Sequence, residues 1–486
     1  MAGKGSSEGA RFSGLAALLL LAACFSCLCL PAAAWGGGVV QEWERRYNML
    51  EPGSWDKPTA MAVDTAGNVY VTGWSQRHGT NWDFDYATIK YSPAGEELWV
   101  RRYIGPVNGD NYASAIAVDL QGNVYVTGRS DGPGNRIDYT TIKYAVDGQQ
   151  LWVRRYHTSE NGSHFPRAMV VDSQGNVYVT GASNSWESGT GFDFATIKYD
   201  TNGKRLWVRR YDGPGNGSDW PNAMAVDHRG NVYITGESEG LGTGYDYATI
   251  MYDSKGREIW VSRYQGPGIA TLYNDDYARA IAVDGQGNVY VTGASSEKWG
   301  DYHCFTTIKY SQRGKELWVR RHQSPGFGAT GIALDSQGNA YVTGYVNGSW
   351  NGWLALRNLT IKYDKNGRKL WARCAKGWTA YSSTYNYDVA PAIAVDSQGN
   401  AYITDNSAVE GNPWGSVGNL RTLKYDTNGK LQWEERYQNY SIARAIALDG
   451  QGHIYVNCEG YGGGGGDQTG YDYLTIKYTQ NPEASR

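Results

Sequence analysis

A unit of roughly 55 residues repeats eight times along this chain, and repetition at that period constrains the fold more than any single residue does. Three markers recur in a fixed cyclic order. The first is AVDxxGNxY, whose aspartate stands at Asp64, Asp119, Asp172, Asp227, Asp284, Asp335, Asp396 and Asp449. The second is TIKY or a near relative, which begins at Thr88, Thr141, Thr196, Thr249, Thr307, Thr360, Thr422 and Thr475. The third is LWVRRY or a relative, with its tryptophan at Trp43, Trp99, Trp152, Trp207, Trp260, Trp318, Trp371 and Trp433.

Each unit is predicted to form four short strands. AIAVD and NVYVTG are rich in β-branched and aromatic residues, and the turn between them, such as 172–176, combines an aspartate acceptor with a glycine suited to positive φ. TIKYD and LWVRRY supply the third and fourth strands. One such antiparallel meander cannot bury its own faces, whereas eight arranged radially can. The sequence therefore predicts an all-β fold, a single β-propeller of eight four-stranded antiparallel blades.

The order of the markers predicts how the ring closes. The chain opens with a fourth strand, residues 43–47, that lacks the three before it, and ends with a third strand, residues 475–478, that lacks its partner. Pairing these two strands would complete the eighth blade and cover two exposed edges. The expected organisation is a signal peptide at 1–34, a short linker at 35–42, the propeller at 43–478 and a tail at 479–486.

The first 34 residues are typical of a secretory signal. Lys4 and Arg11 precede an apolar stretch over 15–30, and the alanines at 32–34 form an A-x-A cleavage site. An exported protein is therefore expected, located in the periplasm, on the cell surface or outside the cell. A second interpretation is a bacterial lipoprotein anchored at Cys24, because residues 21–24 resemble a lipobox.

Charge and cysteine content restrict the partners. The formal charge is −3 and the chain has no basic block, so a nucleic-acid partner is not expected. No transmembrane segment is expected in the mature chain, and a monomer is predicted. Outside the signal lie Cys304, Cys374 and Cys458, of which two at most can pair; small buried apolar side chains are the favoured interpretation.

The repeat resembles a known family. DSQGNVYVTG followed by DYATIKYDxNGxxLWVRRY is similar to the bacterial and archaeal seven-bladed β-propeller repeat (SBBP) family, over residues 43–478. The resemblance implies a propeller, an extracytoplasmic and often surface-associated location, and a role in interaction, with no catalytic motif. Eight repeats favour eight blades, with seven blades and one displaced unit as the alternative. The last repeats drift, for example at Asp405 and Cys458, which replace the usual glycine, and this drift is expected to reflect the closure site.

Two other propeller families share parts of the pattern. Residues 331–344 resemble an NHL-type repeat, found in propellers that bind protein or RNA and in a few lyases. Residues 199–207 resemble the tryptophan-docking motif of pyrroloquinoline-quinone (PQQ) dehydrogenases. This chain lacks the adjacent cysteine pair of those enzymes, and their calcium-binding set cannot be picked out. In both resemblances the tryptophan is expected to pack against the turn of an adjacent blade, which is a structural role.

The variable segments all fall on one predicted face of the propeller. The loops between second and third strands and the crossovers between blades are long and rich in Gly, Asn and Ser, whereas the turns on the other face are short and constant. Exposed rings among polar loops are typical of recognition surfaces, and they can stack on sugars. The candidate ligand-binding residues are Trp74, Trp82, Trp186, Trp299, Trp350, Trp353 and Trp414, with Trp55, Trp220 and Trp378 in the crossovers. The alternative is that these rings cover blade edges.

A second candidate is a polar ring at the mouth of the central tunnel. Its members stand four residues before the alanine, or Gly331, that opens each predicted first strand. They are Asp56, Asn111, His164, Asp219, Asp276 and Asp388, with Phe327 and Ser441 in the remaining repeats. Carboxylates there could hold calcium or select a polar ligand. The favoured alternative is that each accepts backbone N–H groups of the crossover. Asp85, Asp138, Asp193, Asp246 and Asp472 precede TIKY and are expected to cap loops.

Catalytic motifs are lacking, since the chain has no GxSxG, no HExxH and few scattered histidines. No catalytic residue, metal site or cofactor is therefore predicted beyond the calcium considered above. The sequence favours a non-catalytic binding module that recognises a surface or extracellular carbohydrate polymer, or a protein, through its loop-rich face. A propeller enzyme of lyase, glycosidase or quinoprotein type is the alternative.

Overall fold

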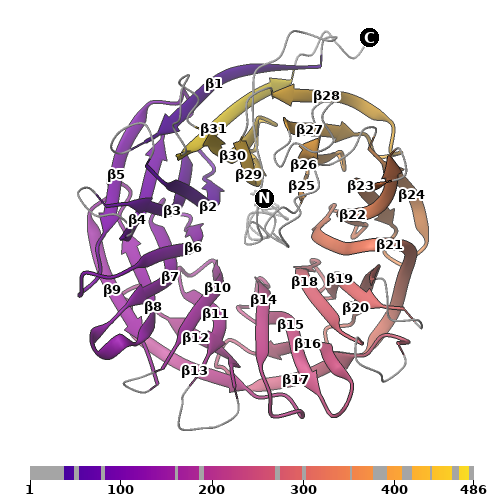
Figure 1. The fold of residues 1–486 in the computed structure, drawn as a ribbon, viewed down its shortest axis with the longest axis horizontal. Coiled ribbons are helices and arrows are strands. Elements are labelled where there is room, and N and C mark those ends of the chain that lie inside the picture. The colour runs from indigo at the N-terminus through magenta and orange to yellow at the C-terminus, as the bar shows by residue number, and fades with distance from the viewer. Residues whose placement is uncertain are drawn as a thin grey trace, which may run out of the picture.

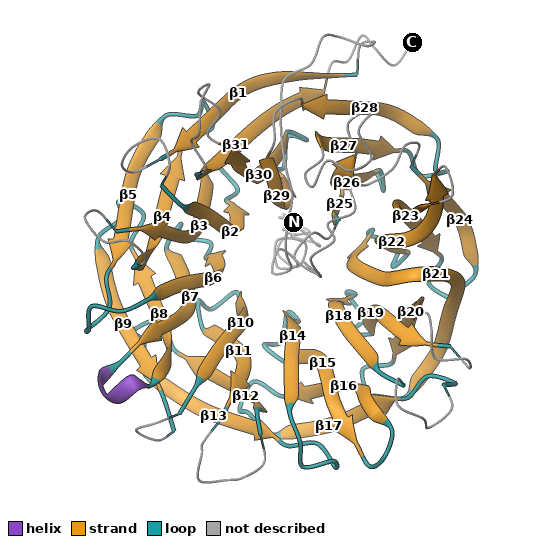
Figure 2. Cartoon of the chain, in the orientation of Figure 1, coloured by secondary structure: helices purple, strands orange, loops and turns teal. Residues whose placement is uncertain are grey.

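The computed structural model places strands radially around a central opening (Figure 1). It describes residues 38–48, 54–77, 83–158, 162–184, 191–268, 274–297, 303–350, 353–375, 391–407, 419–437, 441–461 and 470–480. Apart from one short 3-10 helix, η1 (Pro133–Asn135), the regular elements of these residues are β-strands (Figure 2). The all-β propeller predicted from the repeat is confirmed.

Each repeat supplies its strands in radial order, from the opening to the periphery. We number the blades 1 to 8 by their repeats. The first strands are β2 (Asp56–Val63), β6 (Asn111–Val118), β10 (His164–Val171), β14 (Asp219–Val226), β18 (Asp276–Val283), β25 (Ala392–Val395) and β29 (Ser441–Leu448). The second strands are β3 (Val69–Gln76), β7 (Val124–Asp131), β11 (Val177–Ser183), β15 (Val232–Gly240), β19 (Val289–Ser296), β22 (Ala340–Trp350), β26 (Ala401–Ser407) and β30 (Ile454–Tyr461).

The outer half of each blade follows the same pattern. The third strands are β4 (Phe84–Tyr91), β8 (Ile137–Tyr144), β12 (Asp193–Tyr199), β16 (Gly244–Tyr252), β20 (His303–Tyr310), β23 (Trp353–Tyr363), β27 (Asn419–Tyr425) and β31 (Tyr471–Gln480). The fourth strands are β5 (Glu97–Tyr103), β9 (Gln150–Tyr156), β13 (Arg205–Tyr211), β17 (Glu258–Tyr264), β24 (Lys369–Cys374), β28 (Leu431–Tyr437) and β1 (Val39–Tyr47).

One strand serves two repeats. β21 (Glu316–Leu334) pairs through residues 316–326 with β20 and through residues 326–334 with β22. The described strands therefore form six four-stranded sheets and one seven-stranded sheet that covers repeats five and six. The prediction of eight blades, with seven as the alternative, continues to rest on the repeat count.

The two ends of the chain share a sheet, as the marker order predicts. β1 pairs antiparallel with β31, with Trp43 opposite Lys477 and Tyr47 opposite Tyr473. The pairing is longer than predicted, because it begins with Val39 opposite Gln480. Residues 39–42, expected to belong to a linker, are therefore part of the strand.

The turn chemistry repeats from blade to blade. In blade 1, Asp64 Oδ1 accepts the N–H groups of Ala66 and Asn68, both at 2.9 Å, while its Oδ2 accepts the Tyr70 hydroxyl at 2.9 Å. Gly67 completes the turn at φ 83°, a backbone region that favours glycine. The aspartate of the AVDxxGNxY marker thus fixes the first-to-second turn, as predicted.

The core lies between blades and not within any one of them. Each hydrophobic cluster combines residues of two neighbouring repeats; one joins Tyr70 and Trp99 of blade 1 to Val124 and Ile142 of blade 2. Another joins Met61 of blade 1 to residues of blade 8. Burial of apolar surface therefore holds each blade to the next.

The drift in the late repeats has a local explanation. Asp405 replaces the usual glycine, and Arg421 lies directly opposite it on β27. The two side chains are buried and form a bidentate ion pair, with Arg421 Nη2 2.7 Å from Asp405 Oδ2. Blade 7 does not contain the pairing of the chain ends, so the drift at Asp405 accompanies a compensated buried charge. Cys458, by contrast, lies on β30 in the sheet that contains this pairing.

Several predictions fall on residues outside the described ranges. The signal peptide, its cleavage site and Cys24 lie there, so export and lipidation stay predictions. Cys304, Cys374 and Cys458 are free cysteines; Cys304 and Cys458 are buried and Cys374 is exposed. Within the described ranges, the structure has no helix long and apolar enough to cross a membrane.

Candidate binding surface

The predicted polar ring lies where expected along the chain but is buried. Its described members Asp56, Asn111, His164, Asp219 and Asp276 begin β2, β6, β10, β14 and β18, and each side chain is at most 1% exposed. Asp388 lies outside the described residues. Side chains this deeply buried do not present a polar ring to a ligand, so this part of the expectation is corrected.

The ring residues bind the crossovers instead. Asp219 accepts the Gly213 N–H at 2.7 Å and the Glu239 N–H at 3.1 Å. Asp276 accepts the Gly266 N–H at 2.5 Å and the Ser296 N–H at 3.0 Å. Each carboxylate thus ties an incoming crossover to the end of a second strand, which matches the favoured alternative. Burial raises the pKa of both carboxyls to about 6.

His164 performs the same task with a neutral ring. The Thr158 N–H donates to Nε2 at 3.2 Å, so Nε2 is the acceptor, and Nδ1 lies 2.8 Å from the Ser183 hydroxyl. Burial, aided by the charge of Arg210, lowers the pKa of His164 to about 4. The imidazole is therefore neutral at physiological pH.

The aspartates before TIKY pair with arginines of the fourth strand. Asp85 lies 3.0 Å from Arg102 Nη2, and Asp138 lies 2.8 Å from Arg155 Nε. Asp193, Asp246 and Asp472 make the equivalent pairs with Arg210, Arg263 and Arg46. These aspartates therefore join third strands to fourth strands, a role that the expectation of loop capping missed.

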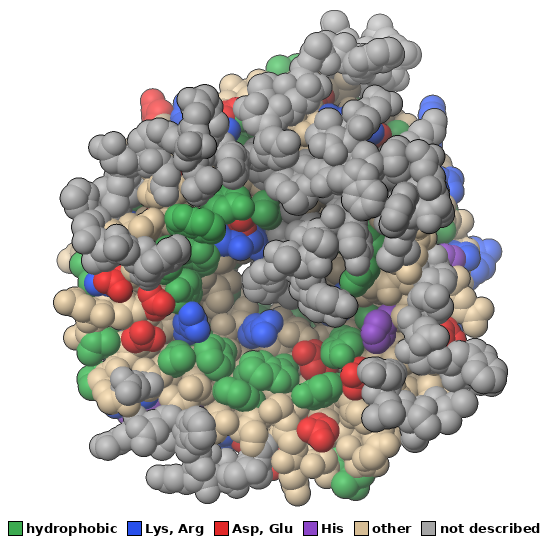
Figure 3. Space-filling model, viewed as in Figure 1, with side chains coloured by type: hydrophobic (Ala, Val, Ile, Leu, Met, Phe, Trp, Pro, Cys, Tyr) green, Lys and Arg blue, Asp and Glu red, His purple; other side chains and the backbone are tan. Residues whose placement is uncertain are grey.

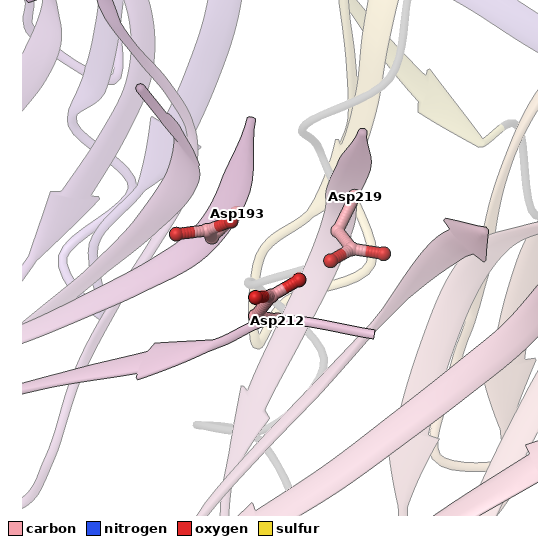
Figure 4. A group of neighbouring side chains, drawn as sticks. All are labelled: Asp193, Asp212 and Asp219. Carbon is pink, nitrogen blue, oxygen red and sulfur yellow. The ribbon is translucent and has the colours of Figure 1, made fainter. Parts of the chain in front are cut away.

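Three carboxylates lie together in blades 3 and 4. One oxygen each of Asp193, Asp212 and Asp219 falls within 4.8 Å of the others (Figure 4). Asp193 binds Arg210, and Asp219 accepts two backbone N–H groups. Both buried members thus have protein donors, and calcium binding stays a prediction.

The predicted loop-face tryptophans divide into three groups. Trp82, Trp186, Trp299 and Trp414 lie outside the described residues. Trp350 and Trp353 stand opposite each other at the tip of the hairpin formed by β22 and β23. Trp74 is half-buried near the end of β3, where its ring lies 4.7 Å from that of Phe84 and 5.4 Å from that of Tyr112 in the next blade.

The predicted crossover residue Trp220 belongs to an aromatic series whose other three members were not predicted from the sequence. The residue after each polar-ring position is Tyr112, Phe165, Trp220 or Tyr277 in four consecutive blades, and each is half-buried on an innermost strand. Aligning the eight repeats at this position would have revealed the aromatic series. Hydrophobic and basic side chains gather around the central opening on the face shown in Figure 3.

Two arginines stack within this series. Arg129 on β7 has its Cζ 4.2 Å from the Tyr112 ring centroid and 5.9 Å from that of Phe165. Arg167 on β10 lies 5.7 Å from the Trp220 ring centroid, and the Phe165 and Trp220 rings are 6.4 Å apart. We call Tyr112, Arg129, Phe165, Arg167 and Trp220 the rim cluster.

A β-bulge sets the position of Arg167. The register between β10 and β11 shifts between Pro166 and Ala168, so Arg167 is the unpaired residue. The bulge requires glycine on the partner strand, since a Cβ on Gly181 would lie 2.1 Å from the Phe165 carbonyl oxygen. The same bulge in blades 1 and 2 directs Thr59 and Ser114 to carbonyls of the next blade.

Charge near the rim cluster is mixed. Asp110 accepts the Tyr112 hydroxyl at 2.9 Å, and Glu237 on β15 accepts from the Asn222 amide. Burial raises the pKa of Glu237 to about 7, although the nearby positive charges of Arg167 and Arg279 act to lower this pKa. The surface can therefore stack rings and pair charges.

The periphery of the ring has a different organisation. Trp99 Nε1 donates to the Val146 carbonyl of the next blade at 3.1 Å, and Trp152 Nε1 donates to the Thr201 carbonyl at 3.1 Å. Arg101 Nε donates to the Gly148 carbonyl at 2.7 Å. We call these fourth-strand tryptophans and arginines the outer belt. The structural role expected for the tryptophans is confirmed.

A protein-family model matches five segments in the N-terminal part of the chain. The SBBP family, described as Beta-propeller repeat, matches residues 51–77, 98–135, 151–185, 207–242 and 262–297. These segments fall in the same repeats whose sequence resembles that family. No curated protein sequence matches this chain.

Comparison with solved structures shows similarity of fold alone. The β-propeller domain of the Trilobed protease from Pyrococcus furiosus aligns with a TM-score of 0.41 and 9% identity, over 81% of this chain and 98% of that one. The polysaccharide lyase Uly1 aligns with a TM-score of 0.44 and 9% identity, over 82% and 93%. A puromycin hydrolase mutant in complex with PGG aligns with a TM-score of 0.46 and 12% identity, over 85% and 60%.

Proposed function

Since the chain is a β-propeller built from SBBP repeats, we propose that it is an exported, non-catalytic binding module. Its ligand is a surface or extracellular carbohydrate polymer, recognised through the loop-rich face. The predicted signal supports export, and the absence of catalytic motifs in the sequence supports binding without turnover.

One observation carries this proposal. Half-buried aromatic rings occupy the same repeat position on four consecutive innermost strands, at Tyr112, Phe165, Trp220 and Tyr277. Most tryptophans of the outer belt are more deeply buried, such as Trp99 and Trp152 at 7% and 8% exposed, although Trp260 is half-buried. Rigid rings lose little entropy on binding and can stack on the C–H faces of sugars. A row of such rings suits an extended polymer.

Binding of residues 35–486 to a panel of cell-wall and extracellular polysaccharides tests the proposal. We expect saturable binding that is lost in Trp220→Ala and retained in Trp220→Phe, because phenylalanine keeps a ring at that position. Trp350→Ala and Trp353→Ala test whether the β22–β23 hairpin contributes. Repeating the titration with calcium and with a chelator tests the calcium prediction.

Two outcomes would overturn the proposal. If no polysaccharide binds, a protein partner becomes the better explanation, and capture from envelope extracts would follow. Progressive shortening of the polymer during incubation would instead show an enzyme of lyase or glycosidase type.

A further inference from the structure

The rim cluster contains two positive charges, which binding of a neutral ligand would not require. Two guanidinium groups stack on three aromatic rings across blades 2, 3 and 4. Stacking covers the flat face of a guanidinium but leaves its N–H groups in the plane, where they can donate to two oxygens of one anion. Both arginine side chains are half-buried and therefore still accessible.

In the part of the chain that the structure describes, the charges of these two arginines are not neutralised by a carboxylate, and no hydrogen bond to a backbone carbonyl occupies them as it does Arg101 and Arg154 of the outer belt. Within the described residues, no carboxylate forms a salt bridge with Arg129 or Arg167. By contrast, Lys57 and Arg444 both pair with Glu459, and the belt arginine Arg155 pairs with Asp138. Across the described ranges, Arg129 and Arg167 thus carry a charge with no anion bound in salt-bridge geometry.

We infer that the rim cluster binds an acidic polysaccharide, with Arg129 and Arg167 pairing to a carboxylate or sulfate on a sugar ring that stacks on Phe165 and Trp220. This inference rests on the proposed function and adds the chemical class of the polymer. The row of contacts, Arg129 to Phe165 to Trp220 to Arg167, places two rings between two positive charges.

The charges around the rim cluster are mixed in sign. Asp110 and Glu237 flank the cluster, and the chain carries a formal charge of −3. A nucleic-acid partner is not expected, because the chain has no block of basic residues to contact a continuous phosphate backbone. An acidic polysaccharide can place one charged group on each arginine and keep neutral hydroxyls beside the carboxylates.

Titration of residues 35–486 with three polymers tests the inference. The probes are polygalacturonate, which carries carboxylates, dextran sulfate, and uncharged dextran. The variants are Arg129→Gln with Arg167→Gln, and the matched control is Arg257→Gln, an exposed arginine in a third-to-fourth turn on the opposite face. Circular dichroism and thermal unfolding of each variant show whether the fold is intact.

We expect at least one acidic polymer to bind at least tenfold more tightly than dextran. The double variant should lose at least tenfold in affinity for it, whereas Arg257→Gln should match the wild type. Preference between polygalacturonate and dextran sulfate identifies the anionic group. Added salt should weaken the wild-type interaction more than that of the double variant.

Failure of this inference differs from failure of the proposed function. If dextran binds as tightly as the acidic polymers, or if the folded double variant keeps its affinity within twofold, the acidic ligand is excluded while carbohydrate binding stands. If none of the three polymers binds, the acidic ligand is excluded, and a blank result on the wider panel then excludes carbohydrate binding as well.

Discussion

The outer belt and the rim cluster use similar residue types for opposite purposes. Both stack arginine on tryptophan: Arg154 lies 5.6 Å from the Trp152 ring centroid in the belt, and Arg167 lies 5.7 Å from that of Trp220 at the rim. In the belt, the Arg154 Nε and the Trp152 Nε1 donate to carbonyls of the next blade. At the rim, the arginine forms no ion pair with a described carboxylate.

The difference shows where the repeat leaves room for function. The belt tryptophan recurs in all eight repeats, and those such as Trp99 and Trp152 meet a turn of the same shape in the next blade. The belt arginine varies more, since Ser262 and Glu435 replace it in two repeats. The rim position varies from Lys57 to Tyr112 to Trp220 without loss of the fold, since its side chain is half-buried. Constant positions therefore maintain the ring, and variable positions on the innermost strands are available to bind.

Removal of β1 should destabilise the fold more than any other change to the outer belt. Truncation of the chain before residue 48 takes away the strand paired with β31, together with Trp43, which is 7% exposed and donates to the Pro93 carbonyl at 3.0 Å. We expect a loss of more than about 5 kcal/mol in the free energy of unfolding, since one buried tryptophan alone contributes about 3–5. Urea denaturation measures it; an unchanged midpoint would contradict the role of the strand.

Trp152→Ala and Trp220→Ala compare the two regions directly. The belt variant should lose about 3–5 kcal/mol of stability, because Trp152 is 8% exposed and bonded to the Thr201 carbonyl. The rim variant should lose about 1 kcal/mol, as expected for a half-buried side chain. Urea denaturation of both variants beside the wild type gives the two values. Equal losses would show that Trp220 has a structural role and would remove the main support for a binding rim.

His164→Asn tests the buried ring beneath the rim. Asn111 occupies the same position in blade 2, so the change suits the fold. The pKa of His164 is about 4 in the folded protein against 6.5 in the free side chain, so the unfolded chain takes up the proton first. The difference in the free energy of unfolding between the wild type and the variant therefore favours the wild type most above pH 6.5. This difference falls by roughly 3 kcal/mol as the pH drops to 4.

Denaturant unfolding of both proteins from pH 4 to 8 measures this difference. Comparing the two curves cancels the opposite contribution of Asp219 and Asp276, whose pKa values of about 6 favour the folded state at lower pH. A difference that does not change with pH would mean that His164 keeps an ordinary pKa.

Glu237→Gln should have the smallest effect and sharpens the account of the rim. Three side chains lie near Glu237: Arg167 of β10, Asn222 of β14 and Arg279 of β18. The pKa of Glu237 is about 7. Its protonation as the pH falls from 8 to 6 removes a negative charge beside Arg167. Affinity for polygalacturonate should then rise by about twofold to fivefold in the wild type, a change typical of one partly screened charge.

Calorimetric titration at each pH measures this dependence. The glutamine variant should bind at pH 8 as the wild type does at pH 6, with little further change. A variant that still follows the wild-type pH profile would assign the dependence to another group.

The sequence predicted the repeated framework because each marker makes its contacts locally or with the equivalent marker of the next unit. Asp64 accepts a hydrogen bond within its own turn, and Trp99 donates one to the turn of the following repeat. The contacts seen in one repeat therefore explain the equivalent contacts in the others. The pairing of β1 with β31 followed from the same order, except that it extends back to Val39.

The binding surface could be predicted only in part. The loop-rich face and Trp74 were identified from composition, but the polar ring was expected at an exposed mouth and is buried against the crossovers. Sequence cannot show which of two alternating side chains on an innermost strand faces the crossover and which remains accessible. The choice between Asp219 and Trp220 depends on how the neighbouring blade packs.

The sequence by itself determined the repeated four-stranded unit, its order and the pairing of its ends, because hydrogen bonds of turns and strands act over a few residues or over one repeat. Only the tertiary structure decided that Arg129, Phe165, Arg167 and Trp220 meet. These residues come from three blades, and their contacts depend on the spacing between blades and on the bulge at Arg167. Packing between units, which no single unit encodes, therefore creates the candidate site.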